Sequence, residues 1–240
     1  MTTTKLTFFV ELVFLLFVKP GELIEIRVLN ATGRLDGGNF YKRTLSGYFD
    51  NHADLLKALA LIKNFTYSGA YFSLQVIDKR LIGRAFNRLK VSDVTTSDKD
   101  VLAYRWLPLD FDPVRPAGIS SSDAELKAAL ALRDKVAPII KERLGLPEPL
   151  LAMSGNGGHA LFRLPDWPAD AEHIAIMKNM LANISKEFST LEVNIDTSVF
   201  NPARIWKLYG TAAHKGDAVS AGEYREARPH RESYIEQLGE

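Results

Sequence analysis

The chain has 240 residues and no cysteine, and its 30 basic side chains nearly balance its 29 acidic ones. An apolar content of 46% and an aromatic content of 10% exclude a disordered, collagen-like or coiled-coil chain. The absence of cysteine excludes a disulfide scaffold, a thiolate zinc site and a cysteine nucleophile, and it favours a reducing, cytoplasmic location. Because the net charge is only +1, any polyanion must be bound by a local cluster of basic residues.

Residues 8–18 form an apolar run that looks like the hydrophobic part of a signal peptide. The run contains Glu11, lacks a small-residue cleavage site and continues into Lys19-Pro20-Gly21. It is also shorter than the roughly 20 apolar residues that span a bilayer. We therefore expect a buried helix or strand of a soluble protein that has no membrane partner.

In the first part of the chain, alternating apolar residues predict strands over 23–29 and 71–77, and helical spacing predicts a helix over 50–65. Gly33 to Gly38 are expected to form a loop or a hairpin turn. Five basic residues lie between positions 79 and 90, a run that forms either a solvated face or a stripe facing phosphates. We place the joint between an N-terminal module (1–100) and a second module (101–240) in the polar stretch 91–100, with both modules in one domain, 1–240.

In the second part, a strand is predicted over 106–112, and a helix begins at the capping box Ser122-x-x-Glu125 and continues to about Leu144, with a kink at Pro138. The further expected elements are strands at 150–153 and 160–164, a helix at 170–188, a strand reaching Asp196 and a strand at 205–209. This order is close to that of a ferredoxin-like or RNA-recognition sheet. We expect an α+β fold in which an N-terminal α/β module packs on an RNA-recognition-like antiparallel sheet.

Asp110 and Asp112 stand two positions apart at the end of the first of these strands. Residues i and i+2 of a strand project from the same face, about 6.5–7 Å apart, so their carboxylates repel each other. A bound divalent cation removes this repulsion, and oxygen ligands favour Mg²⁺ or Mn²⁺. Two solvated acids are the alternative. Asp-x-Asp also serves glycosyltransferases and nucleases, so the pattern leaves the reaction open.

A glycine-rich turn follows, with the sequence Ser154-Gly155-Asn156-Gly157-Gly158-His159. Its glycines allow the backbone to approach a ligand closely and to expose N–H groups to an anion. His159 opens the next strand, where its ring can donate a hydrogen bond to a phosphate oxygen. A plain hairpin with an ordinary histidine is the alternative.

A third carboxylate, Asp196, ends the apolar strand Val193-Asn194-Ile195. It completes a three-carboxylate site with Asp110 and Asp112 if the two strands are neighbours. Arg204 and Lys207 follow shortly after. Basic groups beside metal-binding carboxylates suit a triphosphate, because its charge exceeds what two cations neutralise.

In this order, the motifs resemble those of the archaeo-eukaryotic primase superfamily. Residues 109–120 and 201–211 look like the primase-polymerase branch, which occurs in bacteria, phages, plasmids and CRISPR loci. The resemblance is strong over 100–216 and weaker over 20–100, where Ala85 to Lys90 are similar to a family segment. The chain departs from the family by an extra glycine-like position before His159 and by the lack of the cysteine zinc module of some relatives, so no zinc is expected.

The resemblance implies a DNA primase and DNA-directed polymerase that starts and extends primers on single-stranded DNA with dNTPs or NTPs. Asp110, Asp112 and Asp196 would be catalytic and would hold two divalent cations, Mg²⁺ or Mn²⁺. The residues expected to contact the incoming nucleotide are Ser154, Gly155, Asn156, Gly157, His159, Arg204 and Lys207.

Starting a primer requires a second bound nucleotide, whose triphosphate needs another basic cluster. Two segments qualify, and a solvated face is the alternative for each. The first is 84–90, with Asn87 and Arg88. The second is the tail, with Lys215, His230 and Arg231.

Two other functions compete with a primase-polymerase. One is a non-catalytic nucleic-acid-binding or replication-initiator module of the same fold, which does not need three aspartates and a histidine. The other is a two-metal nuclease, which does not need a triphosphate site. We also expect a catalytic domain that belongs to, or acts beside, a longer protein, with a further C-terminal domain or with CRISPR or replication proteins as partners.

Overall fold

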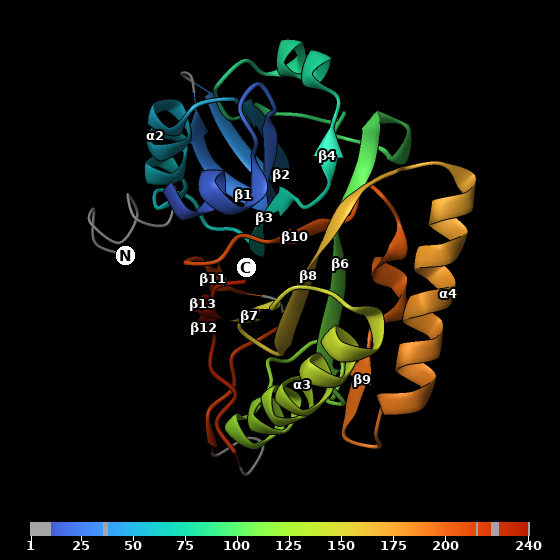
Figure 1. Ribbon diagram of the computed structural model, residues 1–240. Coiled ribbons are helices and arrows are strands. Elements are labelled where there is room, and N and C mark those ends of the chain that lie inside the picture. The colour runs from blue at the N-terminus through green and yellow to red at the C-terminus, as the bar shows by residue number, and fades with distance from the viewer. Residues whose placement is uncertain (1–10, 36–37, 215, 222–225, 240) are drawn as a thin grey trace. The chain divides into compact units, whose positions relative to one another are not determined.

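The computed structural model describes residues 11–35, 38–214, 216–221 and 226–239, which form two compact units (Figure 1). The first unit comprises the chain up to Ala103 together with Pro202–Thr211, and the second comprises Tyr104–Asn201 and Ala212–Glu240. Residues 202–211 were expected in the second module. Among the described residues, no helix has the length and apolar character needed to cross a bilayer.

The first unit contains a five-stranded antiparallel sheet in the order β10-β3-β1-β2-β5. Its strands are β1 (Ile24–Leu35), β2 (Gly38–Phe49), β3 (Gly69–Ser73), β5 (Lys90–Val91) and β10 (Ile205–Lys207). The strand predicted over 23–29 and the hairpin are confirmed, although β1 continues to Leu35 and Gly33 lies inside it. The strand predicted over 71–77 is instead divided between β3 and a second short strand, Val76–Ile77, which belongs to a different sheet.

Helix α2 (His52–Ile62) follows β2 and begins where the Asn51 side chain accepts a hydrogen bond from the Asp54 backbone N–H. Its buried residues are Leu55, Ala58, Leu59 and Ile62, the i, i+3, i+4 spacing of an amphipathic helix. Residues 11–17 of the N-terminal apolar run are also helical. Leu12, Val13 and Phe17 in this run are buried, so it is part of the fold, as predicted.

The basic run over residues 79–90 is helical only in its first half. Residues Lys79–Arg84 form the 3₁₀ helix η1, whose first turn is capped by the Asp78 side chain. A second 3₁₀ turn, η2 (Asp98–Asp100), lies in the stretch predicted as a joint. The short strand β4 (Val76–Ile77) pairs with the start of β6, where Val76 faces Ala103.

In the second unit, the elements follow the order β-α-β-β-α-β. They are β6 (Val101–Pro113), α3 (Asp123–Leu144), β7 (Leu150–Met153), β8 (Gly158–Pro168), α4 (Ala171–Phe188) and β9 (Val193–Ile195). In the sheet, β7 neighbours β8, β8 neighbours β6, and β6 neighbours β9. This is the strand order of a ferredoxin-like or RNA-recognition sheet, so the predicted α+β class is confirmed.

The tail of the chain extends this sheet and adds a ribbon. Strand β13 (Tyr234–Gln237) pairs with β7, and β11 (Ala212–Ala213) pairs with β12 (Arg231–Glu232). These tail strands were not predicted, because their sequence shows no sustained alternation.

The two long helices form as their end signals predict. In α3, the Ser122 hydroxyl accepts from the Glu125 N–H, and the Glu125 carboxylate accepts from the Ser122 N–H, which completes the predicted capping box. The helix passes Pro138 and continues to Leu144, and Gly145 at φ 61° ends it. Helix α4 buries Met177, Leu181 and Ile184 at helical spacing.

Candidate active site

The two aspartates of β6 stand on the half-buried side of an otherwise buried strand. Leu107, Leu109 and Phe111 are fully buried, whereas the side chains of Asp110 and Asp112 are 24% and 40% exposed. Alternation along a strand places the two carboxylates on the face opposite the leucines and the phenylalanine. Burial of the apolar face stabilises this end of the strand, and the two acids lie on the opposite face.

The third aspartate is brought beside them by β9. Phe111 faces Ile195 and Asp112 faces Asn194 in antiparallel register, and the Asp196 N–H donates to the Asp110 carbonyl oxygen at 2.9 Å. The condition for a three-carboxylate site, that the two strands are neighbours, is thus met. Asp110 and Asp196 are adjacent across the ladder.

Each carboxylate already has an interaction in the chain alone. Arg115 donates from Nη1 to Asp112 Oδ1 at 3.0 Å. His159 Nε2 lies 3.5 Å from Asp110 Oδ1. Asp196 caps the 3₁₀ helix η3 (Thr197–Phe200), where it accepts from the Ser198 N–H at 2.7 Å and from the Ser198 hydroxyl at 3.0 Å.

A pocket of about 550 Å³ opens beside two of the aspartates. It is formed by the segment that follows β6 and by the end of β9, and its lining includes Asp112, Arg115, Asn194 and Asp196. The guanidinium of Arg115, 12% exposed, also donates to the backbone oxygens of Pro113 and Ile119. This arginine therefore binds an aspartate and holds the pocket wall.

The donor chemistry of the three aspartates suits an oxygen-preferring cation such as Mg²⁺ or Mn²⁺. As the side chains stand, no group of three acidic or histidine side chains within the described ranges converges on one point. Asp112 accepts from Arg115 instead, and Asp196 accepts from Ser198. Binding of one cation by all three therefore requires another arrangement of these side chains.

The glycine-rich turn forms the predicted hairpin between β7 and β8. The Ser154 hydroxyl accepts from the Gly157 N–H at 3.0 Å and contacts the Gly157 carbonyl oxygen at 3.1 Å. Gly155 has φ 109°, a conformation that favours glycine. A Cβ on Gly157 would lie 2.3 Å from the Phe111 carbonyl oxygen, so this glycine lets the turn touch the aspartate strand.

Other members of the turn hold neighbouring segments. Buried Asn156 accepts from the N–H and the hydroxyl of Ser121, just before α3. His159 is buried and opens β8 beside Asp110, so it reaches the carboxylate site. The triphosphate role predicted for Ser154, Gly155, Asn156, Gly157 and His159 stays a prediction.

Arg204 and Lys207 belong to the first unit, whereas the three aspartates belong to the second. Lys207 lies in β10, is buried, and has its Nζ 5.8 Å from the centre of the Tyr71 ring. Burial lowers the pKa of Lys207 to about 7. Their predicted contact with a nucleotide stays a prediction.

In the first cluster considered for a second nucleotide, one residue is structural. Asn87 has φ 48°, accepts from the Asp50 N–H and donates to the Asp50 carboxylate, so it shapes a turn. Arg88 is exposed. Arg84 donates to the Asp100 carboxylate and to the Thr95 carbonyl oxygen.

In the tail, the basic side chains hold the start of α3 and the nearby loop. Arg231 donates to Asp123 Oδ1 and to the Ser121 carbonyl oxygen, and Arg228 pairs with both oxygens of Glu125. His230 contacts the Gly216 carbonyl oxygen. Lys215 lies outside the described residues, and the proposed role of this cluster stays a prediction.

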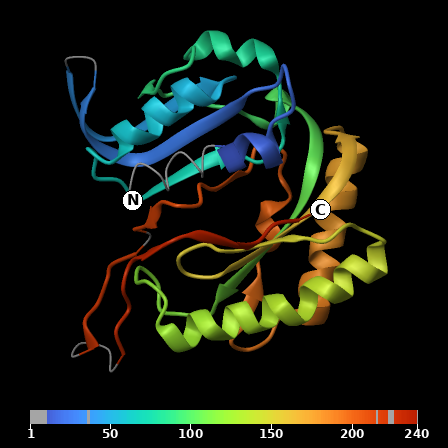
Figure 2. The same cartoon turned by 60° about the vertical axis from the view of Figure 1, so that its left-hand side comes forward.

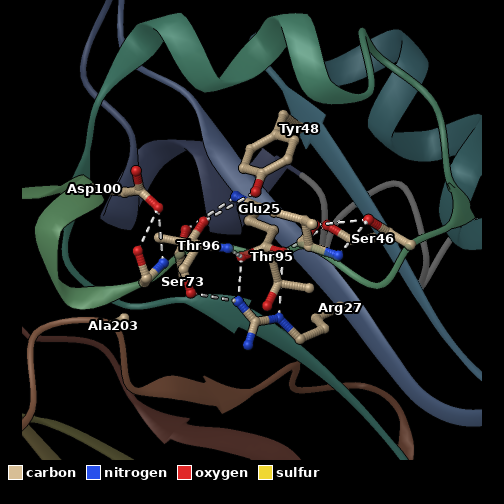
Figure 3. Close-up of polar contacts among 12 residues, drawn as sticks. Glu25, Arg27, Ser46, Tyr48, Ser73, Thr95, Thr96, Asp100 and Ala203 are labelled. Carbon is tan, nitrogen blue, oxygen red and sulfur yellow. Dashed lines mark hydrogen bonds and ion pairs between the residues drawn. The ribbon is translucent and has the colours of Figure 1, made fainter.

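A buried polar cluster in the first unit was not singled out from the sequence (Figure 3). The Glu25 carboxylate is fully buried and accepts from Arg27, from the Ser46 hydroxyl at 2.6 Å and from the Thr96 N–H at 3.4 Å. Arg27 also donates to the Thr96 carbonyl oxygen, and the Tyr48 hydroxyl lies 3.2 Å from that of Thr96. The cluster fastens the segment before β6 to the sheet.

Arg115 is a residue of this site that was not predicted from the sequence. It lies three residues after Asp112 and between Pro113 and Pro116, just beyond the strand predicted over 106–112. Its spacing of three residues from Asp112 does not by itself predict the ion pair, which depends on how the segment after the strand turns back.

No protein-family model matches the chain, and no curated protein matches it. Among solved structures, it is similar to the polymerase domain from Mycobacterium tuberculosis Ligase D in complex with DNA, at 12% identity and a TM-score of 0.49, over 96% of this chain and 80% of that one. It is also similar to the primase RepB′, at 9% identity and a TM-score of 0.42. In that case the alignment covers 98% of this chain and only 56% of RepB′.

Proposed function

We propose that the chain is a nucleotidyltransferase of the primase-polymerase branch of the archaeo-eukaryotic primase superfamily, which starts and extends primers on single-stranded DNA. The observation that carries the proposal is the meeting of Asp110, Asp112 and Asp196 on two paired strands beside a pocket. The glycine-rich turn, in backbone contact with the same strand, supports it.

In this proposal, the three aspartates hold two divalent cations, Mg²⁺ or Mn²⁺. When bound, such cations lower the pKa of a primer 3′-hydroxyl and stabilise the charge that develops on the phosphate during in-line attack. His159, 3.5 Å from Asp110, orients that carboxylate and donates to a phosphate oxygen of the nucleotide. The turn from Ser154 to Gly157 fixes the position of His159.

Arg115 acts as the counter-charge of Asp112 before a cation arrives. Two carboxylates on one strand face repel each other, and the guanidinium at 3.0 Å from Asp112 reduces that repulsion. Because Arg115 is anchored to the carbonyl oxygens of Pro113 and Ile119, it stays in the pocket wall when Asp112 turns away. There it can meet the negative charge of a triphosphate.

A primer-extension assay tests the proposal and separates it from its alternatives. The protein is incubated with Mn²⁺, labelled nucleotides and either a primed or an unprimed single-stranded DNA template. Lengthened or newly made labelled strands are expected. Binding without incorporation would point to a non-catalytic module, and shortened DNA would point to a nuclease.

Two variants, each with two negative charges removed, test the site. The variant Asp110→Asn with Asp112→Asn should lose incorporation, and the next variant is its matched control. The variant Glu142→Gln with Glu172→Gln, at exposed positions on α3 and α4, should retain it. Equal activity of the two variants would contradict the assignment of the site.

A further inference from the structure

The far part of the β1–β2 pair forms a two-stranded arm, which we define as residues 30–35 and 38–43. Strand β3 pairs with β1 from Ile26 to Leu29, and β5 pairs with β2 at Leu45 and Ser46. Beyond these positions β1 and β2 continue to pair with each other as far as Leu35 and Gly38. Figure 2 shows this end of the pair reaching past the other strands of its unit.

One side of the arm is packed, so the arm has a fixed orientation. The rings of Phe40 and Phe65 meet edge to face with their centres 5.3 Å apart. A Cβ on Gly33 would lie 2.6 Å from the Phe65 ring, which shows how closely the backbone approaches it. An isolated two-stranded ribbon is at best marginally stable, and these contacts stabilise this one.

Two bulges, one on each strand, change which side chains the arm exposes. The register shifts on both sides of Ala31, and Asn30 and Lys42 have φ values of 52° and 47°. Lysine rarely adopts this left-handed conformation, and here the Lys42 N–H is held by the Thr32 hydroxyl at 3.0 Å. A bulge redirects side chains and interrupts alternation. As a result Tyr41, Lys42 and Arg43 are exposed in succession.

The chemistry of these three side chains is that of a surface for single strands. Tyr41 is 69% exposed, and Lys42 Nζ lies 5.4 Å from the centre of its ring. Arg43 is 46% exposed and forms an ion pair at 2.8 Å with Asp93, itself 83% exposed. Arg34 on the partner strand is also exposed. In the sequence, these three basic residues stand against two acids, Asp36 between the two strands and Asp93, so the basic charge is in slight excess here.

We propose that this arm binds single-stranded nucleic acid, with a base stacked on Tyr41 and phosphates beside Lys42 and Arg43. Stacking on an aromatic ring is available to unstacked bases and not to those inside a duplex. Exposed basic side chains next to the ring bind the backbone without reading its sequence. The arm belongs to the first unit, whereas the three aspartates belong to the second.

This inference does not depend on the proposed catalysis. Binding is measured with a fluorescent single-stranded oligonucleotide in the absence of nucleotide and divalent cation. A chain that binds through the arm yet incorporates nothing would contradict only the proposed function. A chain that incorporates nucleotide but binds equally well without the arm side chains would contradict only this inference.

The first test compares substitutions of the arm with matched substitutions elsewhere. Tyr41→Ala should weaken binding about 5- to 150-fold, the range measured for loss of one stacked base. Lys42→Gly, which keeps the left-handed backbone, combined with Arg43→Gln should lower the slope of log Kd against log salt by about 1.4, since each phosphate contact contributes about 0.7. Tyr234→Ala, at a 48% exposed tyrosine of β13, and Lys127→Ala with Lys135→Ala on α3 should change neither quantity.

The second test removes a hydrogen bond that holds the bulge and keeps every charge. Thr32→Val deletes the acceptor of the Lys42 N–H, so the affinity for the single strand should fall. Unchanged affinity in Thr32→Val and in the side-chain variants would overturn the proposal. Arm variants that lose binding to duplex DNA but keep their binding to the single strand would overturn it too, because the arm would then be a surface for duplexes.

A third measurement uses the unaltered protein, in case a variant fails to fold. An oligonucleotide carrying 5-bromouracil is irradiated with the protein, and the crosslinked peptide is identified by mass spectrometry. A crosslink within residues 38–43 is expected. Crosslinks confined to other segments would overturn the proposal.

Discussion

The molecule uses carboxylates in two contrasting ways, in the polar cluster of the first unit and at the aspartate site of the second. Glu25 is fully buried and accepts from a guanidinium, a hydroxyl and a backbone N–H. Asp110 and Asp112 are partly exposed and share one strand face beside a pocket. The first carboxylate is enclosed by donors of its own unit, whereas the second pair is open on one side.

This difference distinguishes a carboxylate that holds the fold from carboxylates available for chemistry. A buried acid tolerates removal from water only when its oxygens are hydrogen-bonded and its charge is paired. Two acids on one face, with one arginine in contact with Asp112, keep an excess of negative charge. We expect substitutions in the two places to act on different quantities, stability in the first and activity in the second.

The largest expected effect is at the aspartates. Asp110→Asn with Asp112→Asn should lower nucleotide incorporation by about 1,000-fold or more, because the loss of cation stabilisation is worth roughly 4 kcal/mol. The free energy of unfolding without metal should not fall, since one source of repulsion is removed. Primer extension and urea unfolding measure the two quantities. If the variant unfolded at a lower urea concentration than the unaltered protein, these aspartates would stabilise the fold, as Glu25 does.

Glu25→Gln should show the opposite behaviour. It leaves Arg27, 13% exposed, without its carboxylate, and breaking a buried ion pair costs about 3–5 kcal/mol of stability. Activity per folded molecule should be nearly unchanged. Denaturant unfolding gives the stability, and the double change Glu25→Gln with Arg27→Met should recover part of the loss. A stable Glu25→Gln protein would show that the cluster is not structural.

Lys207 extends the comparison to a buried base in the same sheet as Glu25. Burial lowers its pKa from 10.5 to about 7, so between pH 7 and 10.5 the unfolded chain binds a proton that the folded chain has released. Stability contributed by this group therefore rises with pH through that window. Lys207→Met should stabilise the protein by a few kcal/mol at pH 7 and by progressively less as the pH approaches 10.5. A difference independent of pH would contradict the lowered pKa.

The smallest effect is expected at Arg115. Arg115→Ala removes the guanidinium that competes with a cation for Asp112, and a partly exposed ion pair is worth about 0.2–1 kcal/mol. Mn²⁺ should therefore bind the nucleotide-free protein up to about 5-fold more tightly, as measured by calorimetry. Arg143→Ala, which breaks an exposed pair with Glu187, should have no effect. Weaker Mn²⁺ binding in Arg115→Ala would show that the arginine supports the site.

Much of the fold could be predicted because its signals are local. The capping box at Ser122, the glycine at 145 and the helical spacing of Met177, Leu181 and Ile184 each fix an element from a few neighbouring residues. The tail strands were missed because they form only by pairing with distant partners, as Tyr234 does with Met153. Nor does any local pattern assign β10 to a sheet that begins at Ile24.

The candidate site also has a part that could be predicted from the sequence and a part that could not. Asp110 and Asp112 were recognised from their spacing, and the adjacency of Asp196 followed once its strand was assumed to pair with theirs. The side-chain partners were not predictable, because the contacts of Arg115 and Ser198 depend on the conformation of short segments after a strand. Glu25 was missed for a related reason, since a single acid in an apolar strand gives no indication of its donors.

The path of the chain has a consequence for synthesis on the ribosome. The edge strand β10, which pairs with β3, lies in residues 205–207, although the other strands of its sheet end at Val91. During translation, the first unit must therefore wait with Phe72 and its neighbours lacking this partner until more than a hundred further residues have emerged. At about 5–20 residues per second this interval lasts about 6 to 23 seconds. The nascent protein thus carries an unpaired strand edge, that of β3, through most of the synthesis of the second unit. During this period the edge is a surface that a chaperone can bind.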